Sequence, residues 1–256
     1  MTKRLLSSLF TAALCLPAGA QWNRTVFSGK GESQDIPTPH PLSYFTANPF
    51  LRDDGDDLCD LCTPEGRAKS ALKYSLHVAV RPIGTLAGYR ILDVLYDGSQ
   101  REHPGQIEIN WKSILVRVGP DRYKEIFHLQ ESGTDRPIEP SSIVSSGGEQ
   151  VLATMNSDGG NAGGCWEGYW WFDWSGPHAL DFSRVETAVK NGVPDNTRFS
   201  IHCSDLDLKS GLARSGVQKS DAQCHACDWI GEVTAQFRLS GPIVEPISVD
   251  FKTSEP

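Results

Sequence analysis

The chain has 256 residues, with 24 Lys and Arg against 32 Asp and Glu, a formal net charge of −8, and 39% hydrophobic residues. This length and composition suit one sizeable folded domain, and the acidic balance argues against a nucleic-acid partner. No apolar run beyond the N-terminus approaches the roughly 18 residues of a transmembrane helix, so we do not expect an integral membrane protein.

The first 20 residues have the features of a secretory signal peptide. Lys3 and Arg4 form a basic start, residues 5–16 form an apolar stretch too short to cross a bilayer, and residues 18–20 form a small-residue cleavage site. Removing residues 1–20 takes away two of the 24 basic residues and none of the 32 acidic ones, so the net charge becomes −10. We therefore expect an exported protein of the periplasm or the extracellular space.

The rest of the chain divides into an arm and one domain. Residues 21–57 are rich in Pro, Gly, Ser and Asp and show no sustained period, which predicts an irregular N-terminal arm. Residues 58–256 are expected to form a single β-rich domain. A cap at Thr63 followed by Pro64 and Glu65 predicts a short helix that extends to about Leu72.

Alternating and apolar runs then predict strands. Residues 74–80 alternate between apolar and polar side chains, as in a half-buried strand. Further apolar runs, separated by Gly, Pro and Asp turns, cover residues 89–96, 107–118, 123–129 and 149–155. A C-terminal hairpin is expected from residues 233–239 and 247–251 on either side of a Ser-Gly-Pro turn. The fold class is therefore mainly β, an antiparallel meander or sandwich with one or two short helices and disulfides.

One helix is predicted to interrupt the strands after residue 182. Ser183 and Glu186 have the spacing of a capping box, Val185 and Val189 form an apolar stripe, and Asn191 with Gly192 predicts the end. Its apolar stripe is expected to cover one face of a sheet.

The cysteines predict disulfides. Of seven cysteines, Cys15 lies in the segment to be removed. The six others are Cys59, Cys62, Cys165, Cys203, Cys224 and Cys227, an even number in an exported chain. Four of the six cysteines form two C-x-x-C pairs, so a disulfide between the two remaining cysteines, Cys165 and Cys203, is the simplest pairing. Each C-x-x-C pair could close on itself, or the two pairs could join to each other.

The same cysteines suggest two other chemistries. His225 lies between Cys224 and Cys227, and an imidazolium there could lower a thiol pKa and support thiol–disulfide exchange, although catalytic pairs open a helix rather than precede a hairpin. The two pairs also supply four zinc ligands, but they lie much farther apart in the sequence than in zinc ribbons. We expect no metal and no cofactor.

The most distinctive segment is a glycine-rich stretch, residues 156–164, followed by an aromatic strand. On a strand Tyr169 and Trp171 face one way, while Trp170 and Trp174 face the other with Phe172 between them. One set can fill the core while the other stacks on sugar rings. The competing interpretation is that both sets are buried. The candidate binding residues are Tyr169, Trp170, Trp171 and Trp174.

Two carboxylates of the same strand are candidate catalytic groups. Glu167 and Asp173 could act as general acid and base in glycoside hydrolysis if a cleft brings their carboxyl groups about 5–10 Å apart. The sequence has no H-E-x-x-H and no G-x-S-x-G motif. We therefore favour non-catalytic binding or scaffolding of an unknown partner over a glycan-directed hydrolase, and a glycan or a cell-envelope component is one candidate partner.

Several strand segments resemble those of a family of exported bacterial proteins of unknown function. The similar segments are residues 112–116, 123–130, 147–152 and 221–239, within a match that covers roughly residues 89–256. The resemblance implies an exported β-rich domain and transfers no active site.

Overall fold

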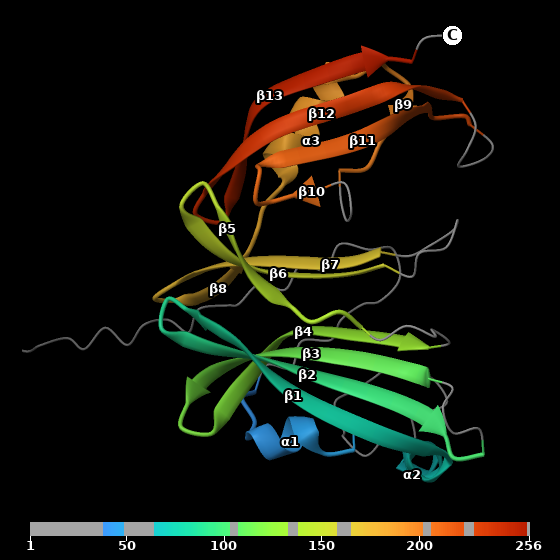
Figure 1. Ribbon diagram of the computed structural model, residues 1–256, viewed down its shortest axis with the longest axis vertical. Coiled ribbons are helices and arrows are strands. Elements are labelled where there is room, and N and C mark those ends of the chain that lie inside the picture. Colours follow the sequence, from blue (N-terminus) through green and yellow to red (C-terminus); the bar gives the residue numbers. More distant parts are fainter. Residues whose placement is uncertain are drawn as a thin grey trace, which may run out of the picture.

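The computed structural model describes residues 38–48, 64–102, 107–132, 138–157, 165–201, 206–222 and 228–254. Three antiparallel sheets follow one another along the chain and stack in three layers, with α1 and α2 beside the first sheet and α3 beside the third (Figure 1). The prediction of a mainly β, antiparallel fold is confirmed. The expected signal peptide and most of the expected arm lie outside the described residues.

The first layer is a meander of four consecutive antiparallel strands. Helix α2 (Pro64–Lys73) leads into it, and its strands in spatial order are β1 (Tyr74–Leu86), β2 (Tyr89–Gln100), β3 (Ile107–Gly119) and β4 (Arg122–Ser132). Ala87 and Gly88 close the β1–β2 hairpin with φ angles of 47° and 86°, the left-handed values that two-residue hairpin turns require. The strands β1 and β2 then pair along their length, with one shift of register between Pro82 and Gly84.

Helix α1 (Leu42–Thr46) covers the outer face of the first sheet. Phe45 is fully buried there, in a cluster that includes Leu92 and Trp111. The Tyr96 hydroxyl donates a hydrogen bond to the Phe45 carbonyl oxygen. His40 and Tyr123 exchange backbone hydrogen bonds of 2.9 and 2.8 Å. Residues 38–48 therefore take a regular conformation inside the segment expected to be irregular, because strands far along the chain supply their partners.

The second layer has hydrophobic side chains on both faces. Its strands in spatial order are β5 (Ser142–Ser146), β6 (Glu149–Ser157), β7 (Cys165–Asp173) and β8 (Gly176–Ala179). Leu152 and Trp170 join a cluster with the first sheet, whereas Val151 and Tyr169 join a cluster with the third. The second sheet is thus the middle layer of the stack.

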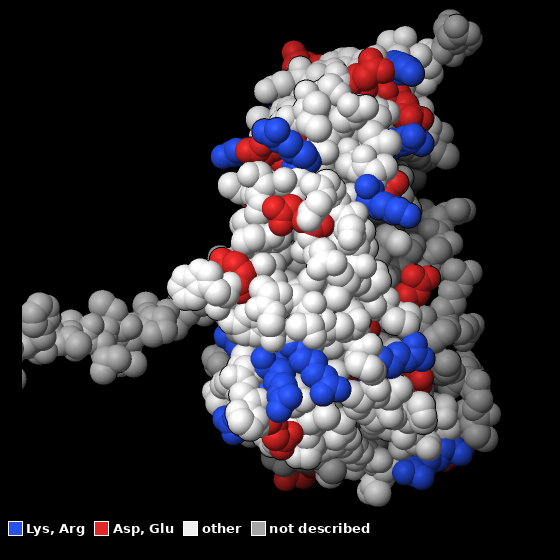
Figure 2. All heavy atoms as spheres, turned by 60° about the vertical axis from the view of Figure 1, so that its left-hand side comes forward, with Lys and Arg blue, Asp and Glu red and all other residues white. Residues whose placement is uncertain are grey.

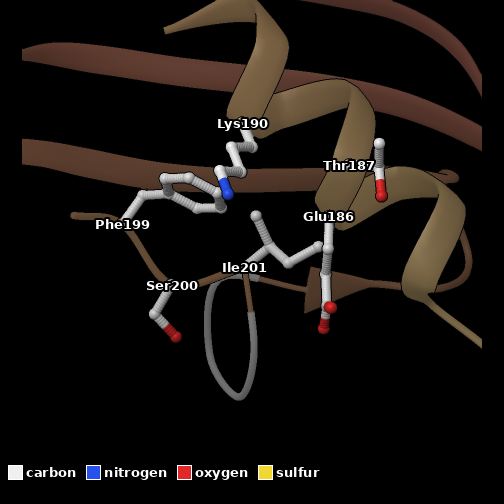
Figure 3. A pocket seen from close by; sticks show the side chains of 6 residues that line it. All are labelled: Glu186, Thr187, Lys190, Phe199, Ser200 and Ile201. Carbon is white, nitrogen blue, oxygen red and sulfur yellow. The ribbon is translucent and has the colours of Figure 1, made fainter. Parts of the chain in front are cut away.

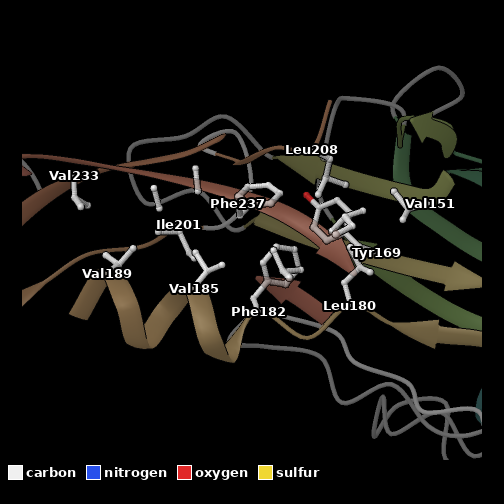
Figure 4. Packing of buried hydrophobic residues seen from close by; sticks show 14 of the residues in the cluster. Val151, Tyr169, Leu180, Phe182, Val185, Val189, Ile201, Leu208, Val233 and Phe237 are labelled. Carbon is white, nitrogen blue, oxygen red and sulfur yellow. The ribbon is translucent and has the colours of Figure 1, made fainter. Parts of the chain in front are cut away.

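The third layer combines a sheet with helix α3 (Ser183–Gly192). Its strands in spatial order are β10 (Leu206–Asp207), β11 (Leu212–Lys219), β12 (Trp229–Ser240) and β13 (Ile243–Thr253), and β9 (Thr197–Arg198) pairs with β11. Val185 and Val189 of α3 point toward the third sheet, as the apolar stripe predicted (Figure 4). No helix in the described part of the chain is long and apolar enough to cross a bilayer.

The predicted capping box of α3 is wrong. Ser183 is the first helical residue rather than the cap, and the Phe182 cap position makes no side-chain hydrogen bond. The Asp181 carboxylate accepts a hydrogen bond from the Ser183 backbone N–H at 2.9 Å instead. Asp181 also pairs with Ile243 of β13, so its backbone is fixed by the third sheet.

Gly168 should be essential for the packing of the middle sheet. A Cβ atom at this position would lie 2.2 Å from the Trp170 indole, and Trp170 is fully buried between the first two layers. We expect Gly168→Ala to lower the free energy of unfolding by about 1–3 kcal/mol, the usual cost of overpacking a core. Urea unfolding followed by circular dichroism measures this change.

The matched control is Gly119→Ala at the end of β3. Its added Cβ would meet Arg122 Cβ at 3.6 Å, an ordinary van der Waals contact. Equal unfolding midpoints for the two variants would contradict the packing of Trp170 over Gly168.

Candidate ligand-binding site

Five residues around one hairpin turn form the candidate site, which we call the β7–β8 turn site: Tyr89, Asp173, Trp174, Ser175 and His178. Asp173 pairs with Gly176 across the hairpin, so Trp174 and Ser175 form a two-residue turn. Gly176 has a φ of 127°, a backbone conformation that favours glycine. The Trp174 side chain extends away from the protein and is 81% exposed.

The Asp173 carboxylate organises this turn. Its Oδ1 atom accepts hydrogen bonds from the Ser175 backbone N–H at 2.7 Å and from the Ser175 hydroxyl at 2.6 Å. The His178 Nε2 atom lies 3.0 Å from the same oxygen. Partial burial would raise the pKa of Asp173, but the hydrogen bonds from Ser175 and His178 together outweigh it and lower the pKa to about 2. The carboxylate is therefore ionised at neutral pH.

Aspartate, serine and histidine meet here, but they do not form a nucleophilic triad. In a triad the imidazole accepts the serine proton at one ring nitrogen and donates to the carboxylate from the other. Here Ser175 Oγ and Asp173 Oδ1 both lie 3.0 Å from the same atom, His178 Nε2. The Ser175 hydroxyl also lies closer to the carboxylate, at 2.6 Å. The cluster fixes the turn and does not activate the serine.

A contact with the first sheet fixes the backbone of Trp174. The Tyr89 hydroxyl donates a hydrogen bond of 2.9 Å to the Trp174 carbonyl oxygen, and the Tyr89 ring lies 6.2 Å from the Phe172 ring. The β7–β8 and β1–β2 turns therefore lie side by side at one end of the stack (Figure 1). The backbone of Trp174 is therefore fixed both by the β7–β8 pairing of the second sheet and by the contact with Tyr89 of the first sheet.

The other aromatic candidates lie within the layers. Trp170 is fully buried, with its ring 5.6 Å from Phe127. Tyr169 is buried on the opposite face, and Trp171 is half-buried with its Nε1 donating to Glu149 Oε2 at 2.8 Å. Of the four predicted binding residues, the structure leaves only Trp174 largely exposed. Residues 173–176 have the pattern Asp-x-Ser-Gly, which is typical of a turn. This pattern is the sequence signal that Trp174 lies in a turn, whereas the three other aromatic candidates lie on the strand.

Glu167 lies on the same face of β7 as Tyr169 and is fully buried. The Tyr169 hydroxyl donates to Glu167 Oε2 at 2.9 Å. Burial and the adjacent Glu167 carboxylate raise the pKa of Tyr169 well above its ordinary value. Glu167 and Asp173 are six residues apart on one strand, which separates them by about 20 Å. Retaining and inverting glycosidases need separations of about 5–10 Å, so these two carboxylates do not form a catalytic pair.

The predicted cysteine sites cannot be placed. Cys165 begins β7, but its side chain and the five other candidate cysteines lie outside the described residues. The Cys165–Cys203 bridge and the alternatives for Cys59, Cys62, Cys224 and Cys227 stay predictions. No group of three or more His, Cys, Asp or Glu suitable for a metal ion occurs among the described residues.

A buried lysine joins the first and second layers. Lys112 Nζ of β3 donates to Thr154 Oγ1 of β6 at 2.7 Å and to the Glu139 carbonyl oxygen at 2.6 Å. Asp93 Oδ2 lies 3.8 Å from Nζ and accepts the Ser141 backbone N–H at 2.6 Å. Burial lowers the pKa of Lys112 to about 8, although Asp93 and Glu139 oppose this shift. The only sequence signal was a lysine inside an apolar run.

A groove of about 340 Å³ lies beside α3 (Figure 3). Its lining residues come from the helix and from the segment that follows β9: Glu186, Thr187, Lys190, Phe199, Ser200 and Ile201. Its volume falls in the range of small-ligand pockets. The described chain stops at Ile201, a lining residue, and resumes at Leu206, so we assign no ligand class to this groove.

Comparison with protein-family models, curated proteins and solved structures found no match to this chain.

The pKa of Asp173 makes a prediction about acid stability. An unfolded Asp titrates near 3.9, whereas folded Asp173 titrates at about 2, so its ionised form stabilises the fold above pH 4 and this contribution is lost as the pH falls toward 2. The difference in unfolding midpoint between the wild type and Asp173→Asn should therefore shrink between pH 4 and pH 2. Asp195→Asn, which removes an exposed carboxylate elsewhere, is the control. A constant difference for Asp173→Asn would contradict the shift.

The pKa of Lys112 predicts that stability also rises with pH in the alkaline range. Between pH 8 and 10 the unfolded lysine keeps its proton while the folded one loses it, so stability should rise with pH. Relative to Lys112→Met, the wild-type free energy of unfolding should increase by about 2 kcal/mol over this range. Denaturant titrations at several pH values measure this slope independently of any constant destabilisation by the substitution. Parallel pH profiles would show that Lys112 keeps its ordinary protonation.

Proposed function

We propose that this chain is an exported, non-catalytic binding protein that recognises a saccharide at the β7–β8 turn site. The observation that carries the proposal is the 81% exposed Trp174 side chain on a turn held by Asp173, Ser175, His178 and Tyr89. Tryptophan is enriched among the side chains that supply most of the energy at binding interfaces. Export is inferred from the N-terminal segment and remains part of the proposal.

The chemistry of the turn suits a sugar ring. The flat indole face offers an apolar surface for the C–H groups of a ring, and a neighbouring carboxylate accepts hydrogen bonds from hydroxyl groups. Asp173 Oδ1 is occupied by the turn, whereas Asp173 Oδ2 makes no hydrogen bond within the described part of the chain. Because the backbone is already fixed, little conformational entropy is lost on binding.

The two other functions considered from the sequence receive less support. The proposed hydrolase needs a close carboxylate pair, and Glu167 and Asp173 are too far apart along β7 to provide it. Thiol–disulfide exchange at Cys224 and Cys227 concerns residues outside the described part of the chain. Binding without catalysis is therefore the function that the geometry supports best.

The proposal predicts that Trp174→Ala weakens saccharide binding at least tenfold, which corresponds to about 1.4 kcal/mol of lost contact. Binding to immobilised xylan, laminarin, dextran, dextran sulfate, polygalacturonate and methyl-esterified pectin would be measured by biolayer interferometry. Trp229→Ala is the matched control, because Trp229 is a second exposed tryptophan, 49% accessible, on β12. Equal losses in the two variants, or no binding to any of these polysaccharides, would overturn the proposal.

A further inference from the structure

One ion pair of this protein lies entirely in its interior. Lys112 of β3 and Asp93 of β2 are both fully buried, with Lys112 Nζ 3.8 Å from Asp93 Oδ2. Elsewhere acidic and basic side chains lie next to one another at the surface, as Figure 2 shows for one face. Among the ion pairs between described residues, only this one has both side chains fully buried. An amine and a carboxyl group in contact and shielded from water are the two halves of an amide bond.

The register of the first sheet places the two side chains as diagonal neighbours. Asp93 pairs with Ile114, and Lys112 pairs with Leu95, two residues farther along β2. Residues two apart on a strand point to the same face, and diagonal neighbours lie within reach of a long side chain. This face is turned toward the middle sheet, because Ile114 belongs to the core shared with that sheet and Nζ reaches Thr154 of β6. The contact is therefore set by the fold.

Two hydrogen bonds orient the Lys112 amine. Nζ donates to Thr154 Oγ1 at 2.7 Å and to the Glu139 carbonyl oxygen at 2.6 Å. An ammonium group has three N–H bonds, so one remains for Asp93. Loss of that proton leaves the nitrogen lone pair on the side of Asp93. Burial, which lowers the pKa of Lys112 to about 8, favours the neutral amine.

The two oxygens of Asp93 have different surroundings. Oδ2 accepts a hydrogen bond from the Ser141 backbone N–H at 2.6 Å. Oδ1 is buried and has no hydrogen-bond partner within the described part of the chain. A backbone N–H aimed at a carboxyl oxygen can stabilise negative charge that develops there during nucleophilic attack. Oδ2 is thus suited to become the oxyanion, and Oδ1 is suited to accept protons and leave.

We propose that Lys112 Nζ and Asp93 Cγ form an intramolecular amide bond that links β2 to β3. A proton first moves from Nζ to Asp93 Oδ1, which gives a neutral amine and a neutral acid. The Nζ lone pair then attacks Cγ, and the electron pair of the C=O bond moves to Oδ2, beside the Ser141 N–H. A second proton moves from Nζ to Oδ1, the Cγ–Oδ1 bond breaks, and one water leaves as the C=O bond re-forms. The amide keeps one N–H, and no oxidant, cofactor or other reactant is consumed.

The buried setting favours this condensation. Two groups held in contact by the fold react as if at effective concentrations of about 10⁵–10⁸ M. The neutral amide also removes two buried charges, which are costly to keep away from water. Lys112 titrates only in chains that lack the bond, so the alkaline pH dependence predicted above applies to those chains. The bond goes beyond the proposed saccharide-binding function and does not depend on it.

Mass spectrometry of the full chain from residue 21 tests the bond. The sample is reduced and alkylated, so disulfides do not change its mass. We expect the wild type to be lighter than its sequence mass by one water molecule, whereas Lys112→Met and Asp93→Ala keep their full mass. Trypsin does not cleave after an acylated lysine, so residues 91–101 should be recovered covalently attached to residues 102–117.

A matched control lies within the same protein. Lys252 Nζ is also 3.8 Å from a carboxylate oxygen, Asp250 Oδ2, but these side chains are 81% and 68% exposed. Because water solvates both groups there, we expect no bond, and trypsin should cleave after Lys252 in the same digest. Linkage of both pairs would overturn the assignment of the reaction to the buried site.

Two further results would overturn the proposal. A wild type of full mass, with residues 102–112 released as an ordinary tryptic peptide, would show that Lys112 and Asp93 form an ion pair only. Loss of water from residues 91–101 without attachment of residues 102–117 would assign it to a succinimide at Asp97-Gly98. Both results would leave the saccharide-binding function to its own test.

Discussion

The side chains of β7 belong to two hydrophobic cores at once, because the middle sheet is covered on both faces. Trp170 fills the core shared with the first sheet, while Tyr169 fills the core shared with the third. The two outer sheets need only one apolar face each toward this layer, whereas the middle sheet needs two. The close approach of Trp170 to Gly168 shows how little free space this arrangement leaves. The stack of three layers thus depends on one aromatic strand.

A buried lysine constrains how the first two layers fit together. Lys112 reaches from the first sheet to Thr154 of the middle sheet, whereas the buried Glu167 is paired with Tyr169 within β7. Burying a charge is costly unless hydrogen bonds replace its water, so a shift of the first layer against the middle layer would leave Lys112 unpaired. We infer that the Lys112 contacts define the register of these two layers more than they add to stability.

The proposed binding surface lies at one exposed end of the stack. Hairpin turns from two sheets meet there, and each turn holds the other through the bond between Tyr89 and Trp174. Turns carry function readily because the sheets behind them remain rigid while their side chains reach solvent. Trp174 continues the aromatic run of β7 past the end of the strand, where no opposing layer covers it.

The sequence by itself determined the elements whose signals are local. The alternation in residues 74–80, the helix at 183–192 and the C-terminal hairpin were predicted because period and turn chemistry belong to contiguous residues. The conformation of residues 38–48 and the burial of Lys112 depend on partners far along the chain, so local patterns did not contain them. The same limit applied to the aromatic strand. Its sequence showed two aromatic faces, but only the stacking of the sheets decided that Trp170 is fully buried and Trp174 exposed, because burial is set by what lies opposite a residue in space.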